Sequence, residues 1–271
     1  MKRIALILDM DGVVYRGDKA IDSSRELVNF LKEKDIPFVF LTNNSTKTPR
    51  AYRKKLLEMG IDVPEDRIIT SGLATRLYMR KHMEPGRIFV IGGEGLHEEM
   101  EKLGWGTVSL EECKKGKWRE IKHVVVGLDP DLTYEKLKYA TLAIRNGARF
   151  IGTNPDTTYP AEEGLYPGAG AIIAALRAST DVEPLIIGKP NEPAYEIAKE
   201  KLGNAGEIWM IGDRLDTDVA FAKRFGMKAV MVLTGVSTLE DVEKSPAKPD
   251  LVLPSVKELV GYLRTVQEEK T

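Results

Sequence analysis

The sequence predicts an α/β protein with a mainly parallel sheet and a second, smaller α/β domain inserted into the first. Short β-branched or apolar runs alternate with longer segments of helical spacing, which is the pattern of βα units. Polar clusters follow the apolar runs in about the first 75 residues and again after about residue 185, whereas the segment between has its own alternation and fewer clusters. We therefore expect a core domain in two parts, 1–79 and 182–271, interrupted by an inserted domain at 80–181.

The individual elements follow from the same periodicity. The apolar runs predict strands at Ile4–Leu8, Phe38–Leu41, Ile88–Ile91, His123–Val126, Leu185–Ile187, Ile208–Ile211, Ala229–Val232 and Leu251–Leu253. The segments of helical spacing predict helices at Ser23–Lys34, Pro49–Met59, Thr133–Asn146, Pro193–Leu202, Thr217–Phe225 and Val256–Leu263. Candidate N-caps are Asp22 and Ser255, and candidate C-terminal stops are Gly60, Gly203 and Gly226.

Composition excludes several classes of protein. The chain has 271 residues, 42% hydrophobic and 30% charged, so it can bury a full core and is neither disordered nor a collagen or disulfide scaffold. Its 40 basic and 41 acidic residues leave a formal net charge of −1, which attracts neither nucleic acid nor an anionic membrane. The run Ile4–Leu8 is too short for a signal peptide, and no run approaches the roughly 20 apolar residues of a membrane span. We expect a cytoplasmic protein without nucleic-acid or membrane partners.

The first of four polar clusters comes directly after the strand Ile4–Leu8 and contains Asp9, Asp11 and Gly12. Side chains two residues apart in an extended segment lie on the same side, about 6.5 to 7 Å apart along the chain. One carboxylate can therefore act as a nucleophile while the other serves as acid and base. The alternative is a strand-end Asp that caps a turn.

The second cluster, Thr42–Ser45, follows the strand Phe38–Leu41 and precedes the helix that begins at Pro49. Its hydroxyl, amide and backbone N–H groups can form a neutral cradle for an anion, although Asn and Ser are also common in ordinary turns. The third cluster, Gly188–Pro190, contains Lys189 at a strand end. Burying an ammonium there is unfavourable unless it meets an anion; a surface lysine is the alternative.

The fourth cluster, Gly212–Asp218, follows the strand Ile208–Ile211 and contains Asp213, Asp216 and Asp218. Carboxylates at the carboxyl end of a strand suit a hard cation such as Mg²⁺, whereas Asp216 and Asp218 also fit a helix N-terminus. A nucleophilic carboxylate, a neutral cradle, a cation and metal ligands together are the set that phosphoryl transfer needs. A phosphate monoester carries a charge of about −2, and the carboxylates of Asp9 and Asp213 add −2. Lys189 and Mg²⁺ together contribute +3. A net charge of roughly −1 therefore remains, which the hydrogen-bond donors of the cradle would stabilise.

These motifs in this order resemble the haloacid dehalogenase (HAD) superfamily of phosphohydrolases. They read DMDGV, TNNS, GKP and GDRLDTD, and the resemblance covers nearly the whole chain. The long insertion and the strings at residues 152–156 and 167–171 resemble the NagD and 4-nitrophenyl phosphatase branch. The resemblance implies a HAD-like Rossmannoid core, an α/β cap of type IIA, and Mg²⁺-dependent hydrolysis of small phosphate monoesters.

The resemblance also implies roles for the acidic residues. Asp9 would form an aspartyl-phosphate and bind Mg²⁺. Asp11 would protonate the leaving alcohol, activate the water that cleaves the intermediate, and offer its backbone carbonyl to the metal. Asp213 would be the third metal ligand, and Asp218 would support the water shell of the metal.

Other residues would contact the substrate. Thr42 and the backbone around Asn43 and Asn44 would hold the phosphoryl oxygens, and Lys189 would balance charge between Asp9 and the phosphate. In the cap, the loop of Asn154, Asp156 and Tyr159 is expected to face the substrate. Some relatives recognise their substrate with a histidine near Tyr159, and this chain lacks it. The choice of substrate among sugar phosphates, nucleotides and similar esters therefore stays open.

Several alternatives stay open or are disfavoured. A phosphotransferase or mutase of the same superfamily is not separated from a hydrolase by sequence. A receiver-type phospho-acceptor module is disfavoured because Lys189 precedes Asp213 and about 100 inserted residues would have no purpose. Cys113 and the three histidines, His82, His97 and His123, are expected to be surface or structural residues. The oligomeric state is open, with a homodimer formed through the cap as one alternative.

Overall fold

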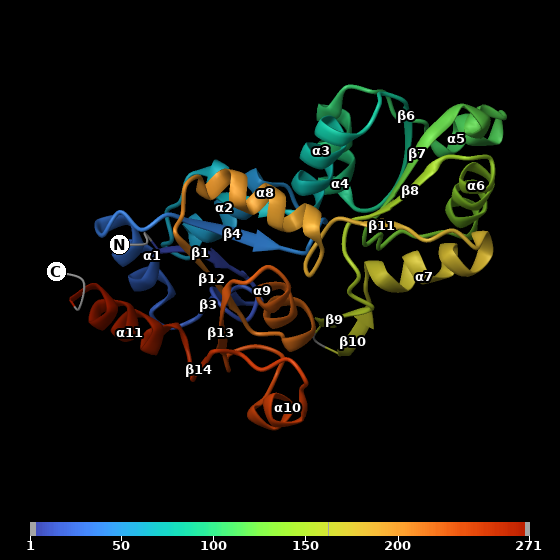
Figure 1. Cartoon of the computed structure of the whole chain (residues 1–271). Coiled ribbons are helices and arrows are strands. Elements are labelled where there is room, and N and C mark those ends of the chain that lie inside the picture. The colour runs from blue at the N-terminus through green and yellow to red at the C-terminus, as the bar shows by residue number, and fades with distance from the viewer. Residues whose placement is uncertain (1–3, 162, 269–271) are drawn as a thin grey trace. The chain divides into compact units, whose positions relative to one another are not determined.

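The computed structural model describes residues 4–161 and 163–268, and its contacts divide the chain into two compact units. Unit 1 comprises Met1–Thr42, Pro49–Ile69 and Tyr195–Thr271, and unit 2 comprises Asn43–Thr48 and Thr70–Ala194. Both contain a parallel sheet with helices, so the predicted α/β class is confirmed (Figure 1). The domain ranges expected from the sequence differ from these two units and stay a prediction. No helix in the described ranges has the length and apolar character required to cross a membrane.

Unit 1 is built on a six-stranded sheet in the order β14-β13-β12-β1-β4-β5. The strands are β1 (Ile4–Leu8), β4 (Phe38–Thr42), β5 (Ile68–Thr70), β12 (Glu207–Gly212), β13 (Lys228–Val232) and β14 (Leu251–Leu253). From β1 the chain proceeds outward to β4 and β5 on one side and later to β12, β13 and β14 on the other. That reversal is a topological switch point, where α/β sheets bind ligands at the carboxyl ends of their strands.

The helices of unit 1 cover both faces of this sheet. They are α1 (Ser24–Glu33), α2 (Pro49–Glu58), α8 (Glu192–Leu202), α9 (Ala220–Arg224), α10 (Leu239–Lys244) and α11 (Val256–Glu268). The first residues of α8 belong to unit 2. Two short turns complete the unit, the 3-10 turn η1 (Glu65–Arg67) and the π-helical turn η3 (Leu215–Val219). Side chains of α1, α2 and α11 form one core with Leu6, Phe40 and other alternate strand residues. The intervening residues, among them Ile7 and Val39, are also fully buried on the opposite face. A small hairpin, β2 (Tyr15–Arg16) with β3 (Lys19–Ala20), follows β1.

Unit 2 has its own four-stranded parallel sheet in the order β11-β8-β7-β6. Its strands are β6 (Arg87–Ile91), β7 (Ile121–Val126), β8 (Arg149–Gly152) and β11 (Leu185–Ile186), and an antiparallel hairpin joins β9 (Thr158–Ala161) to β10 (Gly164–Pro167). Figure 1 shows α3 (Ser71–His82) and α4 (Glu94–Leu103) on one face of the sheet, and α6 (Tyr134–Arg145) and α7 (Ala169–Thr180) on the other. The short elements α5 (Leu110–Lys114) and η2 (Lys117–Glu120) complete the unit.

All eight predicted strands are present, and five predicted helices begin and end within a few residues of the expected positions. The sixth, predicted at Thr217–Phe225, consists of η3 and α9. The N-cap prediction at Asp22 is wrong, because Ser23 enters α1 in a left-handed conformation with φ 65° and is itself the N-cap. The Ser255 prediction is confirmed by its side chain, which accepts a hydrogen bond from the Lys257 N–H at 3.1 Å.

Candidate active site

The acidic cluster of unit 1 is assembled by the pairing of β1 with β12. These strands are parallel and place Leu8 opposite Ile211, so Asp9 and Asp213 both lie just beyond the same sheet edge. The Asp9 N–H donates to the Ile211 carbonyl at 2.9 Å, which extends the ladder by one step. Ligand oxygens of Asp9, Asp213 and Asp218 all lie within 4.8 Å of one another. The predicted metal ligands Asp9, Asp213 and Asp218 are therefore brought together.

Asp218 reaches this cluster through η3. The wide turn returns the chain so that the Asp218 N–H donates to the Arg214 carbonyl at 3.1 Å. The Asp218 Oδ2 atom accepts hydrogen bonds from the Asp213 N–H at 3.2 Å and the Arg214 N–H at 3.1 Å. Asp213 and Asp218 are almost completely buried. Asp216 belongs to the same sequence cluster but forms an ion pair with the Arg214 side chain at 2.8 Å instead.

The residue types and positions in this cluster fit a hard divalent cation. Carboxylate oxygens are the ligands that Mg²⁺ takes in proteins, and carboxylates this close repel one another unless positive charge is added. Two glycines pack against these carboxylates, where a larger residue would collide with them. A Cβ on Gly12 would lie 2.6 Å from Asp213 Oδ2, and a Cβ on Gly212 would overlap with Asp218.

Asp11 lies on the turn that follows β1. The N–H groups of Val14 and Tyr15 donate to the Met10 carbonyl, and Gly12 has a φ of 79°, so the chain turns immediately after Asp11. Partial burial raises the pKa of the Asp11 carboxyl, against the opposing charge of Lys55. A carboxyl group with a raised pKa is suited to donate a proton.

The segment Thr234–Ser237, one residue beyond the end of β13, holds the cluster in place and is not among the four polar clusters predicted from the sequence. The Val236 N–H donates to Asp213 Oδ2 at 2.7 Å, and the Thr234 hydroxyl donates to the Gly12 carbonyl at 2.6 Å. The Ser237 N–H donates to the Asp213 carbonyl at 3.1 Å. A signal for it exists: Thr-Gly-Val-Ser is a polar, glycine-containing stretch one residue after a predicted strand, like the four clusters that were found.

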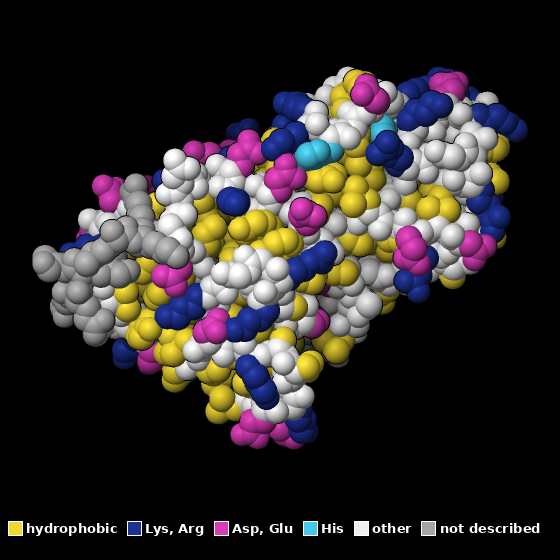
Figure 2. Space-filling model, in the orientation of Figure 1, with side chains coloured by type: hydrophobic (Ala, Val, Ile, Leu, Met, Phe, Trp, Pro, Cys, Tyr) yellow, Lys and Arg dark blue, Asp and Glu magenta, His cyan; other side chains and the backbone are white. Residues whose placement is uncertain are grey.

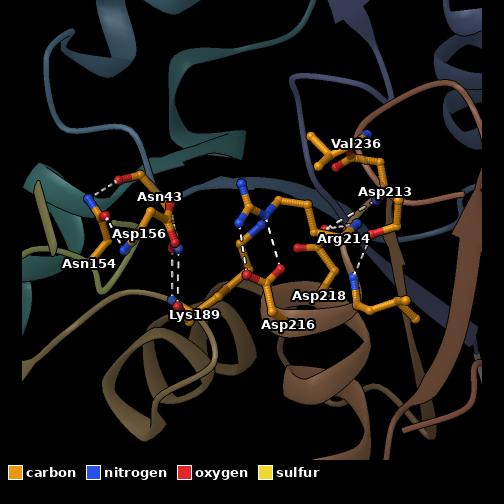
Figure 3. Close-up of polar contacts among 11 residues, drawn as sticks. Asn43, Asn154, Asp156, Lys189, Asp213, Arg214, Asp216, Asp218 and Val236 are labelled. Atoms are coloured by element: carbon orange, nitrogen blue, oxygen red, sulfur yellow. Dashed lines mark hydrogen bonds and ion pairs between the residues drawn. The ribbon is translucent and has the colours of Figure 1, made fainter. Parts of the chain in front are cut away.

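Unit 2 contains a separate polar network that joins three predicted site segments (Figure 3). The Asn43 Nδ2 atom donates to both carboxylate oxygens of Asp156, at 3.1 and 3.2 Å, and to the Lys189 carbonyl at 3.0 Å. Asn43 Oδ1 accepts from the Lys189 N–H at 2.8 Å. Asn154 Nδ2 donates to the Asn43 carbonyl at 2.7 Å. Lys189 is 2% exposed, which excludes the surface lysine considered from the sequence.

The remaining predicted substrate residues are divided between the two units. Thr42 ends β4 in unit 1 and is buried. The Asn44 side-chain oxygen accepts hydrogen bonds from the Thr46 N–H at 2.8 Å and the Thr46 hydroxyl at 2.7 Å, so this side chain fixes its own turn. Tyr159 lies in β9, and its ring packs edge-on against the Tyr166 ring with centroids 5.8 Å apart.

Two family models match the chain. Residues 6–106 match the model described as haloacid dehalogenase-like hydrolase, and residues 186–259 match a second HAD-hydrolase-like model. Among curated proteins, an acid sugar phosphatase of Staphylococcus aureus is 40% identical over 260 residues, which cover 96% of this chain and 97% of that protein.

Solved structures agree with these matches. A hypothetical protein from Pyrococcus horikoshii OT3 is 72% identical with a TM-score of 0.94, covering 96% of this chain and 99% of that one. A 4-nitrophenylphosphatase from Thermotoga maritima is 41% identical with a TM-score of 0.87, covering 95% of this chain and 96% of that one. The similarity therefore spans both units.

Proposed function

This chain belongs to the haloacid dehalogenase-like hydrolase family and is a phosphatase, and we propose that it hydrolyses small phosphate monoesters with Mg²⁺ through an aspartyl-phosphate on Asp9. The observation that carries the proposal is the group of three carboxylates, Asp9, Asp213 and Asp218, at the switch point of the unit 1 sheet. The resemblance of the chain to the NagD and 4-nitrophenyl phosphatase branch, expected from its sequence, is confirmed.

In the first step, an Asp9 carboxylate oxygen attacks the phosphorus atom. The new O–P bond forms as the bond from phosphorus to the ester oxygen breaks, and Asp11 gives its proton to the departing alkoxide. The alcohol leaves and the phosphoryl group stays on Asp9. The raised pKa of Asp11 favours the protonated form that this step requires.

In the second step, water cleaves the aspartyl-phosphate. Asp11, now a carboxylate, accepts a proton from the water while the water oxygen attacks phosphorus. The bond between phosphorus and Asp9 breaks, which releases inorganic phosphate and restores the Asp9 carboxylate. Each proton therefore passes through one side chain, and Asp11 ends the cycle protonated as it began.

Mg²⁺ would be held by the carboxylates of Asp9 and Asp213 and the main-chain carbonyl of Asp11, with Asp218 supporting its water ligands. When bound, the ion supplies positive charge that polarises the phosphoryl oxygen and offsets the repulsion between the phosphate and the carboxylates. Asp218 already holds the Asp213 and Arg214 N–H groups through Oδ2, so it also fixes the direction of the neighbouring ligand.

The phosphoryl oxygens would be bound by the Thr42 hydroxyl and the backbone N–H groups of Asn43 and Asn44, with Lys189 supplying a second positive charge. The substrate class is small phosphate esters, with sugar phosphates as the first candidates because the curated relative is an acid sugar phosphatase. Tyr159 on the β9–β10 hairpin would contact the sugar or other leaving group.

A panel of phosphate esters tests the proposal. Release of inorganic phosphate is measured from sugar phosphates, glycerol phosphate, nucleotides and 4-nitrophenyl phosphate, with Mg²⁺ or with EDTA. Hydrolysis is expected with Mg²⁺ only, and Asp9→Asn and Asp11→Asn are each expected to abolish it while circular dichroism and melting temperature stay unchanged. Substantial hydrolysis by Asp9→Asn would exclude Asp9 as the nucleophile, and phosphate appearing on an added alcohol instead of in solution would indicate a phosphotransferase.

A further inference from the structure

One side-chain carboxamide in unit 2 pairs with both main-chain groups of a single lysine. Asn43 Oδ1 accepts the Lys189 N–H at 2.8 Å, and Asn43 Nδ2 donates to the Lys189 carbonyl at 3.0 Å. The same Nδ2 also donates to the Asp156 carboxylate. An asparagine amide has two N–H donors, and both are used by these partners. The Asn43 side chain therefore has no donor left for a phosphate oxygen.

The orientation of this carboxamide is fixed by the chemistry of its partners. The Lys189 carbonyl and the Asp156 carboxylate are both acceptors, so the nitrogen of Asn43 must face them. The Lys189 N–H is a donor, so the oxygen of Asn43 must face it. Rotating the amide by half a turn would place oxygen against oxygen at two positions and nitrogen against nitrogen at the third. Asp156 and the Lys189 main chain therefore favour the same orientation of the Asn43 amide.

We call the pairing of the Asn43 side chain with the Lys189 main chain the clamp. The residues around it hold the clamp rigid. The Asn43 carbonyl accepts hydrogen bonds from Asn154 Nδ2 at 2.7 Å and from the Ser71 hydroxyl at 2.5 Å, so its main chain is also held. Asn43 is 9% exposed and Lys189 is 2% exposed. A Cβ on Gly188 would lie 2.6 Å from Asn43 Oδ1, which shows how closely the two segments pack. Figure 3 shows the side chains of Asn43, Asn154 and Asp156 grouped beside the Lys189 main chain.

We infer that the Asn43 side chain is a positioning residue that acts through Lys189, with Asp156 and Asn154 holding it in place, rather than a group that binds substrate. The inference rests on the proposed function, in which the Lys189 charge faces the phosphate. The Lys189 side chain is buried along its length and starts from a main chain that Asn43 holds at both its N–H and its carbonyl. Displacements of about 1 Å at a reacting group can cost 10²-fold in rate.

A double-mutant cycle separates action through Lys189 from direct binding of substrate. The four proteins are the parent, Asn43→Ala, Lys189→Ala and the double variant, and kcat and KM are measured with 4-nitrophenyl phosphate at saturating Mg²⁺. Asn43→Ala is expected to lower kcat about 10- to 100-fold in the parent. In the Lys189→Ala background the same change is expected to cost less than about twofold, because the group on which Asn43 acts is already absent.

Three outcomes overturn the inference. Fold losses that multiply in the double variant would mean that Asn43 acts independently of Lys189, and an unchanged kcat for Asn43→Ala would mean that the clamp has no effect. If Lys189→Ala itself keeps full activity, the proposed role of Lys189 fails and the inference falls with it. The single variants therefore distinguish the two failures. Asn146→Ala is the matched control, since its Nδ2 also donates to a main-chain carbonyl, that of Arg119, from an exposed position.

A second pair of variants covers the case in which Asn43→Ala does not fold. Asn43→Asp keeps the shape but places a carboxylate against the Lys189 carbonyl and the Asp156 carboxylate. Adding Asp156→Asn restores a donor opposite the new carboxylate and removes the repulsion between the two acids. The double variant is expected to regain at least about fivefold in kcat over Asn43→Asp, with both melting temperatures recorded. No recovery would overturn the role of Asp156 and Asn43 as a single clamp.

Discussion

Gly235 packs directly against the Asp213 side chain and leaves no room for a methyl group, because a Cβ on Gly235 would overlap with the Asp213 carboxylate. Gly235 does not have the left-handed backbone that favours glycine, so the contact alone explains the need for this residue. Gly235→Ala is expected to displace Asp213 and to lower kcat about 100-fold, the typical cost of misplacing a catalytic group by 1 Å. Steady-state hydrolysis measured across a range of Mg²⁺ concentrations tests this.

The control for Gly235→Ala is Gly261→Ala in α11. Nothing lies within 4 Å of a Cβ at Gly261, and alanine in a helix interior stabilises by roughly 0.5–1 kcal/mol relative to glycine. Gly261→Ala is therefore expected to keep full activity and a slightly higher melting temperature. Equal activity in both variants would contradict the role assigned to the Gly235 contact.

Asp218 Oδ2 accepts two main-chain N–H groups, while the proposed function assigns the metal's water ligands to the other oxygen, and Asp218→Asn separates these two roles. An asparagine oxygen can still accept the Asp213 and Arg214 N–H groups that now bond to Oδ2, but the amide nitrogen cannot take the place of the second oxygen toward a metal or its water. We expect the fold to persist and the Mg²⁺ concentration for half-maximal activity to rise about 10- to 100-fold. Titration of activity with Mg²⁺ measures this shift.

Asp216→Asn provides the comparison for that experiment. Asp216 lies two residues away in the same turn, but its exposed carboxylate forms an ion pair with the Arg214 guanidinium. Its replacement removes the same charge without touching the cluster, so half-maximal Mg²⁺ is expected to stay within about twofold. A similar shift in both variants would mean that net charge, and not position, determines metal affinity.

A buried ion pair between α3 and α4 makes a prediction about stability. Glu99 is 2% exposed and accepts a hydrogen bond from the Arg76 guanidinium at 2.7 Å. Glu99→Leu leaves the Arg76 charge in a largely buried place without this partner, and we expect a loss of at least about 2 kcal/mol in the free energy of unfolding. Adding Arg76→Met removes the unpaired charge and is expected to recover most of that loss.

Urea denaturation of the parent, the single variant and the double variant measures the effect. A double variant that is less stable than Glu99→Leu would show that the ion pair is not the source of the loss.

The strands that carry the acidic cluster could be predicted because each is an uninterrupted apolar run followed at once by acidic residues. β8 is missing from the sequence prediction because it is short and begins with the charged Arg149. α7 is missing because apolar residues surround the helix and hide its period.

The contacts of Asn43 with Asp156 and Lys189 join residues 113 and 146 positions apart. Periodicity describes only neighbouring residues, so such pairings emerge from tertiary packing. The Thr234–Ser237 segment is different, because a polar, glycine-containing stretch after a predicted strand is a local signal that the sequence does contain.

His123 is a buried histidine in β7 whose protonation opposes folding. It is 4% exposed, its Nε2 atom lies 3.1 Å from the Glu84 carbonyl, and its ring packs near Trp105. Within the described residues its Nδ1 atom has no hydrogen-bond partner. Burial lowers the pKa of His123, with a further contribution from the charge of Arg149 against the opposing hydrogen bond to Glu84. The folded chain therefore holds this imidazole neutral.

The stability of the protein is accordingly expected to fall as the pH drops below the pKa of an unfolded histidine, about 6.5. Below that pH the unfolded chain binds a proton that the folded chain does not, so protonation favours unfolding, by about 1.4 kcal/mol for each pKa unit of separation. His123→Leu removes this proton uptake at the cost of the Glu84 hydrogen bond. We expect it to be less stable than the parent at pH 8 but to lose less stability between pH 7 and 5. Urea denaturation at each pH measures both effects, and His82→Gln, at an exposed histidine, is the control. A parent-like slope in His123→Leu would assign the pH dependence to other groups.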